Sequence, residues 1–70
     1  MSWNYRLVKQ THNDEVSYGI HEVYYDDQGN PESITKNPVA VAEESKGDIM
    51  TTLRQMERAL TMPTLNYEDF

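Results

Sequence analysis

The stretch that decides the fold is Tyr18-Gly19-Ile20-His21-Glu22-Val23-Tyr24-Tyr25-Asp26-Asp27-Gln28-Gly29-Asn30-Pro31. It begins as a run rich in β-branched and aromatic residues, which is typical of a strand, and it ends in a cluster of turn-forming residues. The strand is predicted over residues 16–25, and its length allows it to pair with a neighbour on each side. We therefore expect it to lie in the centre of an antiparallel sheet.

The pattern of this strand leaves open which of its faces is buried. One face carries Tyr18, Ile20, Glu22 and Tyr24, and the other carries Gly19, His21, Val23 and Tyr25. Each set mixes apolar with polar residues, so either both faces of the sheet are partly covered or a bulge near Glu22 switches the alternation. We expect Ile20 to point inward, leave Val23 undecided, and assign Gly19 to a bulge or a close backbone approach.

Two further strands are predicted, one on each side of this central strand. Residues 3–10 alternate with period two, and residues 11–15 form a hairpin loop because Asn-Asp pairs tolerate left-handed backbone. The tight connection that follows the central strand contains Gly29, which is free to adopt a positive φ. Residues 32–37 form a short strand between two prolines. Because proline lacks the N–H that a sheet needs, this strand belongs at an edge.

A single amphipathic helix is predicted over residues 46–61. Ser45 is placed to cap it, and Asp48 follows at the spacing of a capping box. Its apolar residues recur at steps of four, three and four: Ile49, Leu53, Met56 and Leu60. This periodicity predicts a stripe, with Leu53 at its centre, that is buried against the sheet, and Pro63 ends the helix.

Together these elements predict one α+β domain spanning residues 1–70, with a three-stranded antiparallel meander followed by a helix on one face (β-β-β-α). The tail, residues 63–70, is expected either to fold back onto the domain or to be mobile. A three-stranded sheet with one helix leaves its second face and one edge exposed. A homodimer is therefore a reasonable expectation, because it would bury more apolar surface than so small a chain buries alone.

Composition narrows the classes of partner. Twelve acidic and six basic residues leave a formal net charge of −6, which argues against a DNA- or RNA-binding surface and fits a protein partner with a basic surface. The absence of cysteine excludes disulfides and thiolate–metal sites. The first residues do not form an apolar leader, and no apolar run is long enough to span a membrane, so we expect a cytoplasmic location.

His12, His21 and Glu22 are the only group of residues that suggests metal binding or acid–base chemistry. Neighbouring residues of a strand point to opposite faces, so His21 and Glu22 do not chelate jointly without a bulge. Nucleotide-binding glycine motifs and nucleophile motifs are missing, so we expect no enzyme activity, no catalytic residue and no cofactor. A minor enzyme or metal site at these three residues is one alternative. A small acidic inhibitor that mimics nucleic acid is another.

The aromatic residues of the predicted strands form the candidate interface: Trp3, Tyr5, Tyr18, Tyr24 and Tyr25. Tyrosine and tryptophan are enriched at protein interfaces, although cross-strand packing within the sheet explains the same residues. A base-stacking platform would add lysines and arginines, and only Arg6, Lys9 and Lys36 are near. These features predict a small non-catalytic protein-interaction module that binds a basic protein partner.

Three segments resemble a group of short uncharacterised bacterial proteins: Trp3-Asn4-Tyr5-Arg6, Tyr18-Gly19-Ile20-His21-Glu22-Val23-Tyr24-Tyr25-Asp26 and Asn37-Pro38-Val39-Ala40. Members of that group also close with a leucine-rich helix followed by a proline, and the resemblance implies no activity. More distantly, the β-β-β-α order resembles the small domain of HicB-type antitoxins. That resemblance implies an antitoxin-like role, in which the partner would be a small toxic ribonuclease.

Overall fold

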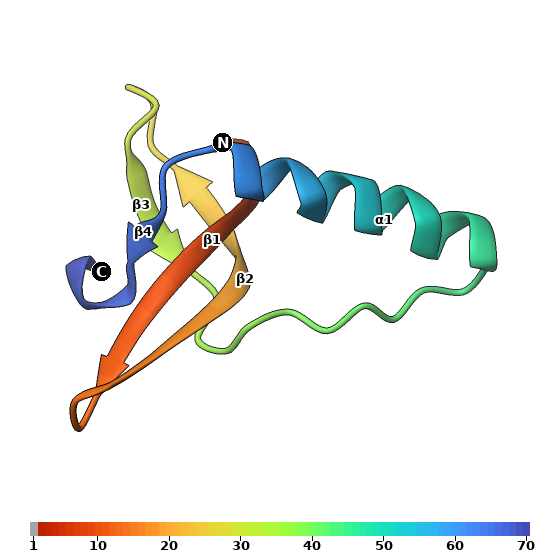
Figure 1. The fold of residues 1–70 in the computed structure, drawn as a ribbon. Coiled ribbons are helices and arrows are strands. Elements are labelled where there is room, and N and C mark those ends of the chain that lie inside the picture. The colour runs from red at the N-terminus through yellow and green to blue at the C-terminus, as the bar shows by residue number, and fades with distance from the viewer. Residues whose placement is uncertain (1) are drawn as a thin grey trace.

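A long, curved two-stranded hairpin forms the centre of the molecule (Figure 1). The computed structural model describes residues 2–70, and Met1 lies outside the described residues. The elements in chain order are β1 (Ser2–His12), β2 (Glu15–Tyr25), β3 (Pro31–Ile34), α1 (Lys46–Arg58), the 3-10 turn η1 (Ala59–Thr61), β4 (Leu65–Asn66) and the 3-10 turn η2 (Tyr67–Asp69). The mixed α+β class is as predicted, and the helix spans the predicted range when η1 is included.

The sheet has four strands, in the order β3-β2-β1-β4, and not the three that the sequence predicts. The additional strand, β4, comes from the tail and pairs in parallel with β1 at Val8 and Lys9. Two residues are too short to show any periodicity, so this strand carries no sequence signal. The third strand ends at Ile34 rather than at residue 37, and β2 lies between β1 and β3 as expected.

Both predicted turns have the expected backbone. His12 pairs with Glu15, and the two residues between them have positive φ, 49° for Asn13 and 68° for Asp14. This conformation matches the twist of a two-residue hairpin. In the connection between β2 and β3, Gly29 has φ +81°, and its N–H donates to the carbonyl oxygen of Asp26 at 3.0 Å.

Gly29→Val is expected to lower the free energy of unfolding by about 1–2 kcal/mol, because a β-branched residue is strained at positive φ. An added Cβ would meet no atom within 4 Å, so the cost is conformational rather than steric. Gly29→Asn is the matched control, since asparagine tolerates this backbone and should cost less. Urea unfolding of both variants measures the difference. Equal losses for both variants would mean that the cost does not come from the strain of a β-branched residue at positive φ.

Both faces of the sheet are at least partly covered, which is the first of the two alternatives that the sequence left open. We call the first the histidine face, on which Arg6, Val8, His21 and Val23 are all buried. The opposite helix face carries Leu7 and Ile20, which are only half-buried beneath α1. Val23, not Ile20, is therefore the fully enclosed apolar residue of β2, beside the buried His21. A register irregularity does occur, but at Tyr24 and Tyr25 against β3 rather than near Glu22.

The C-terminal segment covers the histidine face through a polar network. Arg6 donates from Nη1 to the Tyr25 hydroxyl at 2.8 Å and from Nη2 to the carbonyl oxygen of Pro63 at 2.7 Å. The Tyr25 hydroxyl in turn donates to Asn4 Oδ1 at 2.7 Å. These bonds connect β1 and β2 to the chain just before β4. The tail therefore packs onto the sheet. Folding back onto the domain was one of the two outcomes that the sequence left open.

The segment between β3 and α1, residues 35–45, forms an extended strap. The Thr35 N–H donates to the Glu22 carbonyl oxygen at 3.1 Å, and the Val39 N–H donates to that of Ile20 at 2.8 Å. Between these points Pro38 lies against Gly19, so the glycine allows the close approach that its position in the strand suggested. The strap then runs out beside α1 (Figure 1).

Helix α1 is capped as predicted but is less buried than predicted. The Ser45 hydroxyl accepts a hydrogen bond from the Asp48 N–H at 3.1 Å. Met56 and Ala59 are buried near the sheet, whereas Leu53 is 49% exposed and Leu60 is 63% exposed. The prediction that Leu53 lies at the centre of a buried stripe is therefore wrong, because only one end of the helix reaches the sheet and the rest projects from it (Figure 1). Among the described residues, none of the helices combines the length and the apolar character needed to cross a membrane.

Candidate functional site

Two aromatic side chains form an exposed corner on the helix face. Trp3 and Tyr5 are alternate residues of β1, so their side chains emerge on the same side of the sheet. Their ring centroids lie 5.2 Å apart at an interplanar angle of 87°, an edge-to-face arrangement that aromatic pairs favour. Trp3 remains 49% exposed. We call this pair, together with Tyr24, the aromatic corner.

Strand β2 adds a tyrosine and a carboxylate directly opposite this pair. Tyr24 is the cross-strand partner of Trp3, and Glu22 is the cross-strand partner of Tyr5. The Tyr24 hydroxyl donates to Glu22 Oε1 at 2.6 Å, and this hydrogen bond raises the pKa of Tyr24 above its ordinary value. A negative charge is thus held at the edge of the aromatic corner.

The strap brings a second carboxylate to the same place. Glu43 accepts a hydrogen bond on Oε2 from the Thr52 hydroxyl of α1 at 3.1 Å. Burial, and then the charges of Glu22 and Glu43, raise the pKa of Tyr5. Within residues 2–70, neither carboxylate has a lysine or arginine nitrogen within 4.0 Å. The two carboxylates therefore form no ion pair with these groups, although Arg58 lines the pocket beside the corner.

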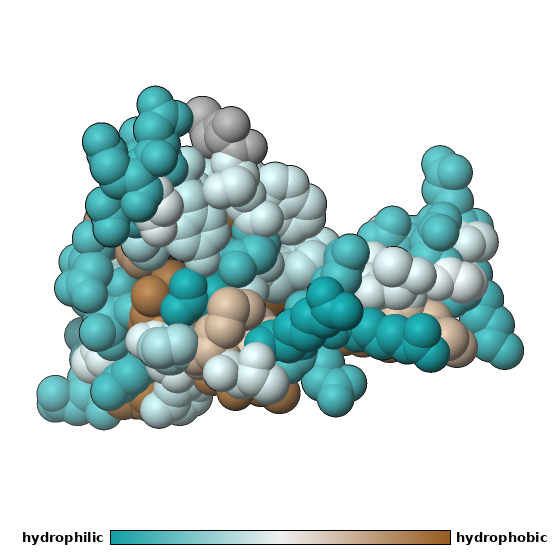
Figure 2. Space-filling view, turned by 90° about the horizontal axis from the view of Figure 1, so that it is seen from above, coloured by the Kyte–Doolittle hydropathy of each residue, from teal (hydrophilic) through white to brown (hydrophobic). Residues whose placement is uncertain are grey.

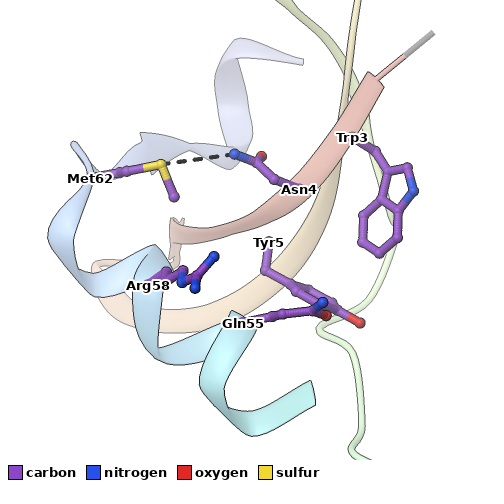
Figure 3. Close-up of a pocket in the computed structure, with 6 residues that line it drawn as sticks. All are labelled: Trp3, Asn4, Tyr5, Gln55, Arg58 and Met62. Atoms are coloured by element: carbon purple, nitrogen blue, oxygen red, sulfur yellow. Dashed lines mark hydrogen bonds between the residues drawn. The ribbon is translucent and has the colours of Figure 1, made fainter. Parts of the chain in front are cut away.

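A pocket of about 320 Å³ opens between the aromatic corner and the end of α1 (Figure 3). It is lined by Trp3, Asn4, Tyr5, Gln55, Arg58 and Met62. Gln55 and Arg58 enter from the helix, and Asn4 Nδ2 lies 3.8 Å from the Met62 sulfur on the other side of β1 (Figure 3). Its volume is at the lower end of the range for ligand sites, so it suits one side chain better than a cofactor.

Tyr5→Phe is expected to make the stability less sensitive to alkaline pH. The raised pKa means that the folded state holds the phenolic proton more tightly than the unfolded chain, whose tyrosines ionise near pH 10. This contribution is fully present below pH 10 and is lost as the pH rises through the folded-state pKa. Urea unfolding from pH 8 to about 11 should show a shallower decline for Tyr5→Phe. Tyr18→Phe, a tyrosine that does not face Glu22, is the control, and an equal effect there would contradict the assignment.

The structure does not gather the five candidate interface residues into one patch. Trp3, Tyr5 and Tyr24 lie together, while Tyr18 lies on the same face toward the far end of the hairpin. Tyr25 lies on the opposite face, in the network with Arg6. Sequence reasoning missed Glu43, Gln55 and Arg58, which come from the strap and the helix. No local pattern marks these residues, because only the path of the chain brings them to β1.

His12, His21 and Glu22 are not brought together either. His12 is exposed at the end of β1, and Glu22 lies on the helix face. His21 is enclosed on the histidine face, with Nδ1 2.9 Å from the Thr35 carbonyl oxygen and its ring tilted against that of Tyr67. Among the described residues, no three histidine or acidic side chains are grouped as metal ligands.

Comparison with known proteins gives no assignment: no family model, no curated protein and no solved structure matches this chain. The aromatic corner and its carboxylates are the features of the described residues that indicate what the chain binds. That geometry can hold a cation against ring faces and can supply hydrogen-bond donors from the helix.

Proposed function

We propose that the protein is a small non-catalytic interaction module that binds a basic segment of a protein partner at the aromatic corner. The observation that carries this proposal is the exposed Trp3 ring, packed on Tyr5 near two carboxylates, Glu22 and Glu43, whose charges act on Tyr5 and which form no ion pair among the described residues. A ring face attracts a lysine or arginine head group, and tryptophan does so best. The carboxylates strengthen this attraction and disfavour an acidic residue in the same place.

The remaining groups of the pocket suit the backbone of such a segment. Gln55 and Arg58 present N–H donors on the helix side, at which a carbonyl oxygen of the partner can accept. A cation over an aromatic ring contributes about 0.5–2 kcal/mol, so one basic side chain anchors the contact but does not supply the whole affinity. The surrounding surface of the partner has to supply the rest.

The charge of the whole chain favours the same class of partner. A net charge of −6 steers a basic protein toward this surface and raises the association rate, most strongly at low ionic strength. The resemblance to HicB-type antitoxins implies a small ribonuclease as one member of this class. We include an antitoxin-like role in this proposal. Such a role uses the same binding site, so the same binding experiments test it.

Trp3 is the only tryptophan of the chain, so its fluorescence reports directly on the proposed site. Titration with a lysine- and arginine-containing peptide is expected to change the Trp3 emission, and an otherwise identical peptide with glutamate at these positions is expected to leave it unchanged. The response should weaken as salt is added, because exposed charges are screened.

The double variant Glu22→Gln with Glu43→Gln removes both charges and should weaken the basic peptide's binding about tenfold or more. Glu44→Gln is the matched control for Glu43→Gln, because it converts the neighbouring exposed carboxylate into the same amide. Equal weakening by the control, or an equal response to the acidic peptide, would overturn the proposal. A pull-down from host cells with the wild-type chain and with Trp3→Ala then identifies the partner that depends on the corner.

A further inference from the structure

Helix α1 and the 3-10 turn η1 that continues it carry two adjacent stripes, and only one of them is covered. The inner stripe faces the sheet and the strap and is largely buried: Ile49, Thr52, Met56 and Ala59. The outer stripe is exposed along its whole length: Lys46, Met50, Leu53, Glu57 and Leu60. The outer residues recur at steps of four, three, four and three, the spacing of a seam between paired helices. Its three apolar members, Met50, Leu53 and Leu60, therefore lie on one line, and each is about half exposed or more.

An apolar groove continues this outer stripe onto the sheet. It has a volume of about 480 Å³ and lies on the side of α1 away from the aromatic corner. Its walls are Leu7, Tyr18, Gly19 and Ile20 from the hairpin and Leu53, Met56, Glu57 and Leu60 from the helix. Glu57 is its only charged residue, so the groove suits an apolar occupant.

The shape of the molecule leaves this surface open. Its radius of gyration is 12.8 Å, whereas a compact chain of this length has about 11 Å. The excess comes from the helix, which forms a lobe of its own beside the sheet (Figures 1 and 2). A projecting helix of this length gains little from its own hydrogen bonds in water and needs a packed apolar face.

The distribution of charge along α1 indicates which partner fits this surface. Helix α1 contains three of the six basic residues but only two of the twelve acidic ones, so the negative charge of the chain lies mainly elsewhere. On the outer stripe, Lys46 precedes Leu53 and Glu57 follows it. When two such helices run antiparallel about Leu53, Lys46 of each lies opposite Leu60 of the other, and Glu57 of that copy is about 4.5 Å further along the helix, within reach of a lysine side chain. A parallel pair would instead place like charges opposite each other. The outer stripe is therefore complementary to a second copy of itself.

We propose that this surface is the interface of a homodimer, in which two α1 helices pack antiparallel about a two-fold axis near Leu53. Each helix covers the outer stripe and the groove of the other copy, giving the isologous contact typical of symmetric dimers. The half-exposed apolar side chains of the outer stripe, with Val16 and Tyr18, present roughly 500 Å² per copy. Two such patches reach about 1,000 Å², which is at the lower limit for a specific interface. The proposal does not depend on the aromatic corner, which stays exposed in the dimer.

Sedimentation equilibrium tests the association. The wild-type chain is expected to be a dimer at micromolar concentration, and Leu53→Glu is expected to weaken dimerisation about tenfold or more, because it places two carboxylates at the axis. Thr51→Glu introduces the same residue on the opposite, exposed side of α1 and should dimerise like the wild type. Circular dichroism establishes that both variants remain folded. A wild-type chain that stays monomeric up to submillimolar concentration overturns the proposal, as does equal weakening by both variants.

Crosslinking tests the symmetry without relying on a disruptive substitution. The chain has no cysteine, so a single Leu53→Cys variant has one thiol, and across a two-fold axis it meets its own copy. Mild oxidation is expected to convert most of this variant into a covalent dimer, and Thr51→Cys should remain uncrosslinked because its thiols point apart. Crosslinking of both variants to the same extent would show random collision and overturn the proposed axis.

Discussion

Arg6→Met is expected to lower the free energy of unfolding by about 2–4 kcal/mol, the largest effect of any single change described here. Arg6 is only 9% exposed, and its guanidinium donates to the Tyr25 hydroxyl and to the Pro63 carbonyl oxygen. Methionine fills much of the same volume but donates to neither group. Both acceptors, in a partly buried network, would then lose this donor, and leaving such groups unpaired costs more than the bonds themselves contribute.

The loss of stability in Arg6→Met should first affect the C-terminal segment and only then the whole domain. The Pro63 bond secures the chain immediately before β4, so the variant is expected to release the C-terminal segment from β1 and expose Val8. For a domain whose total stability is about 5–15 kcal/mol, a loss of this size removes a large share. Hydrogen exchange should show faster exchange in residues 62–67 than in the β1–β2 hairpin.

Two control variants separate the effect of losing the Arg6 hydrogen bonds from the effect of removing a positive charge. Arg54→Met removes an exposed arginine from α1 and should change the stability by less than about 0.5 kcal/mol. Tyr25→Phe removes one of the two Arg6 contacts and should cost less than Arg6→Met. A neutral or stabilising Arg6→Met would contradict the prediction. It would mean that the desolvation of Arg6 offsets what its two hydrogen bonds contribute, as happens for some buried charges.

Gly19→Val is expected to lower the free energy of unfolding by about 1–3 kcal/mol, the cost typical of overpacking. A Cβ at this position would lie 2.8 Å from Pro38 Cγ and 3.0 Å from Pro38 Cβ, which is closer than carbon atoms approach. The strap has to move, and with it the bond between the Val39 N–H and the Ile20 carbonyl oxygen. Val39 would then detach from the edge of β2.

This displacement should also reach the candidate site. The strap carries Glu43 to the aromatic corner, so its movement should reduce the contribution of that carboxylate to the raised pKa of Tyr5. Urea unfolding measures the stability, and tyrosine absorbance between pH 9 and about 12 measures the ionisation. Gly47→Ala is the control because its nearest neighbour, Ser45 Oγ, lies 3.9 Å from the added Cβ, and it should slightly stabilise the helix. A Gly19→Val variant as stable as the wild type would contradict the close packing at Pro38.

The parts of the fold that follow from the sequence alone depend on residues a few positions apart. Asn13 and Asp14 adopt the left-handed backbone that such residues tolerate, and Gly29 takes the positive φ that its turn requires. Ser45 caps the helix through the Asp48 N–H, within the same turn. These interactions are short in range, so the local sequence is sufficient to determine them.

The tertiary structure alone decided which surfaces are covered. His21 and Arg6 are polar, so their pattern does not predict burial, and they are enclosed because Thr35 and Pro63 supply acceptors from distant parts of the chain. Leu53 is the opposite case, an apolar residue that is half exposed. The helical periodicity predicts an apolar stripe but not the angle at which the helix meets the sheet. The charge of Glu43 acts on Tyr5 only because the strap runs beside α1, where Glu43 accepts a hydrogen bond from Thr52. Periodicity in a sequence reports the shape of one element, whereas burial and the charge at a site depend on how several elements pack together.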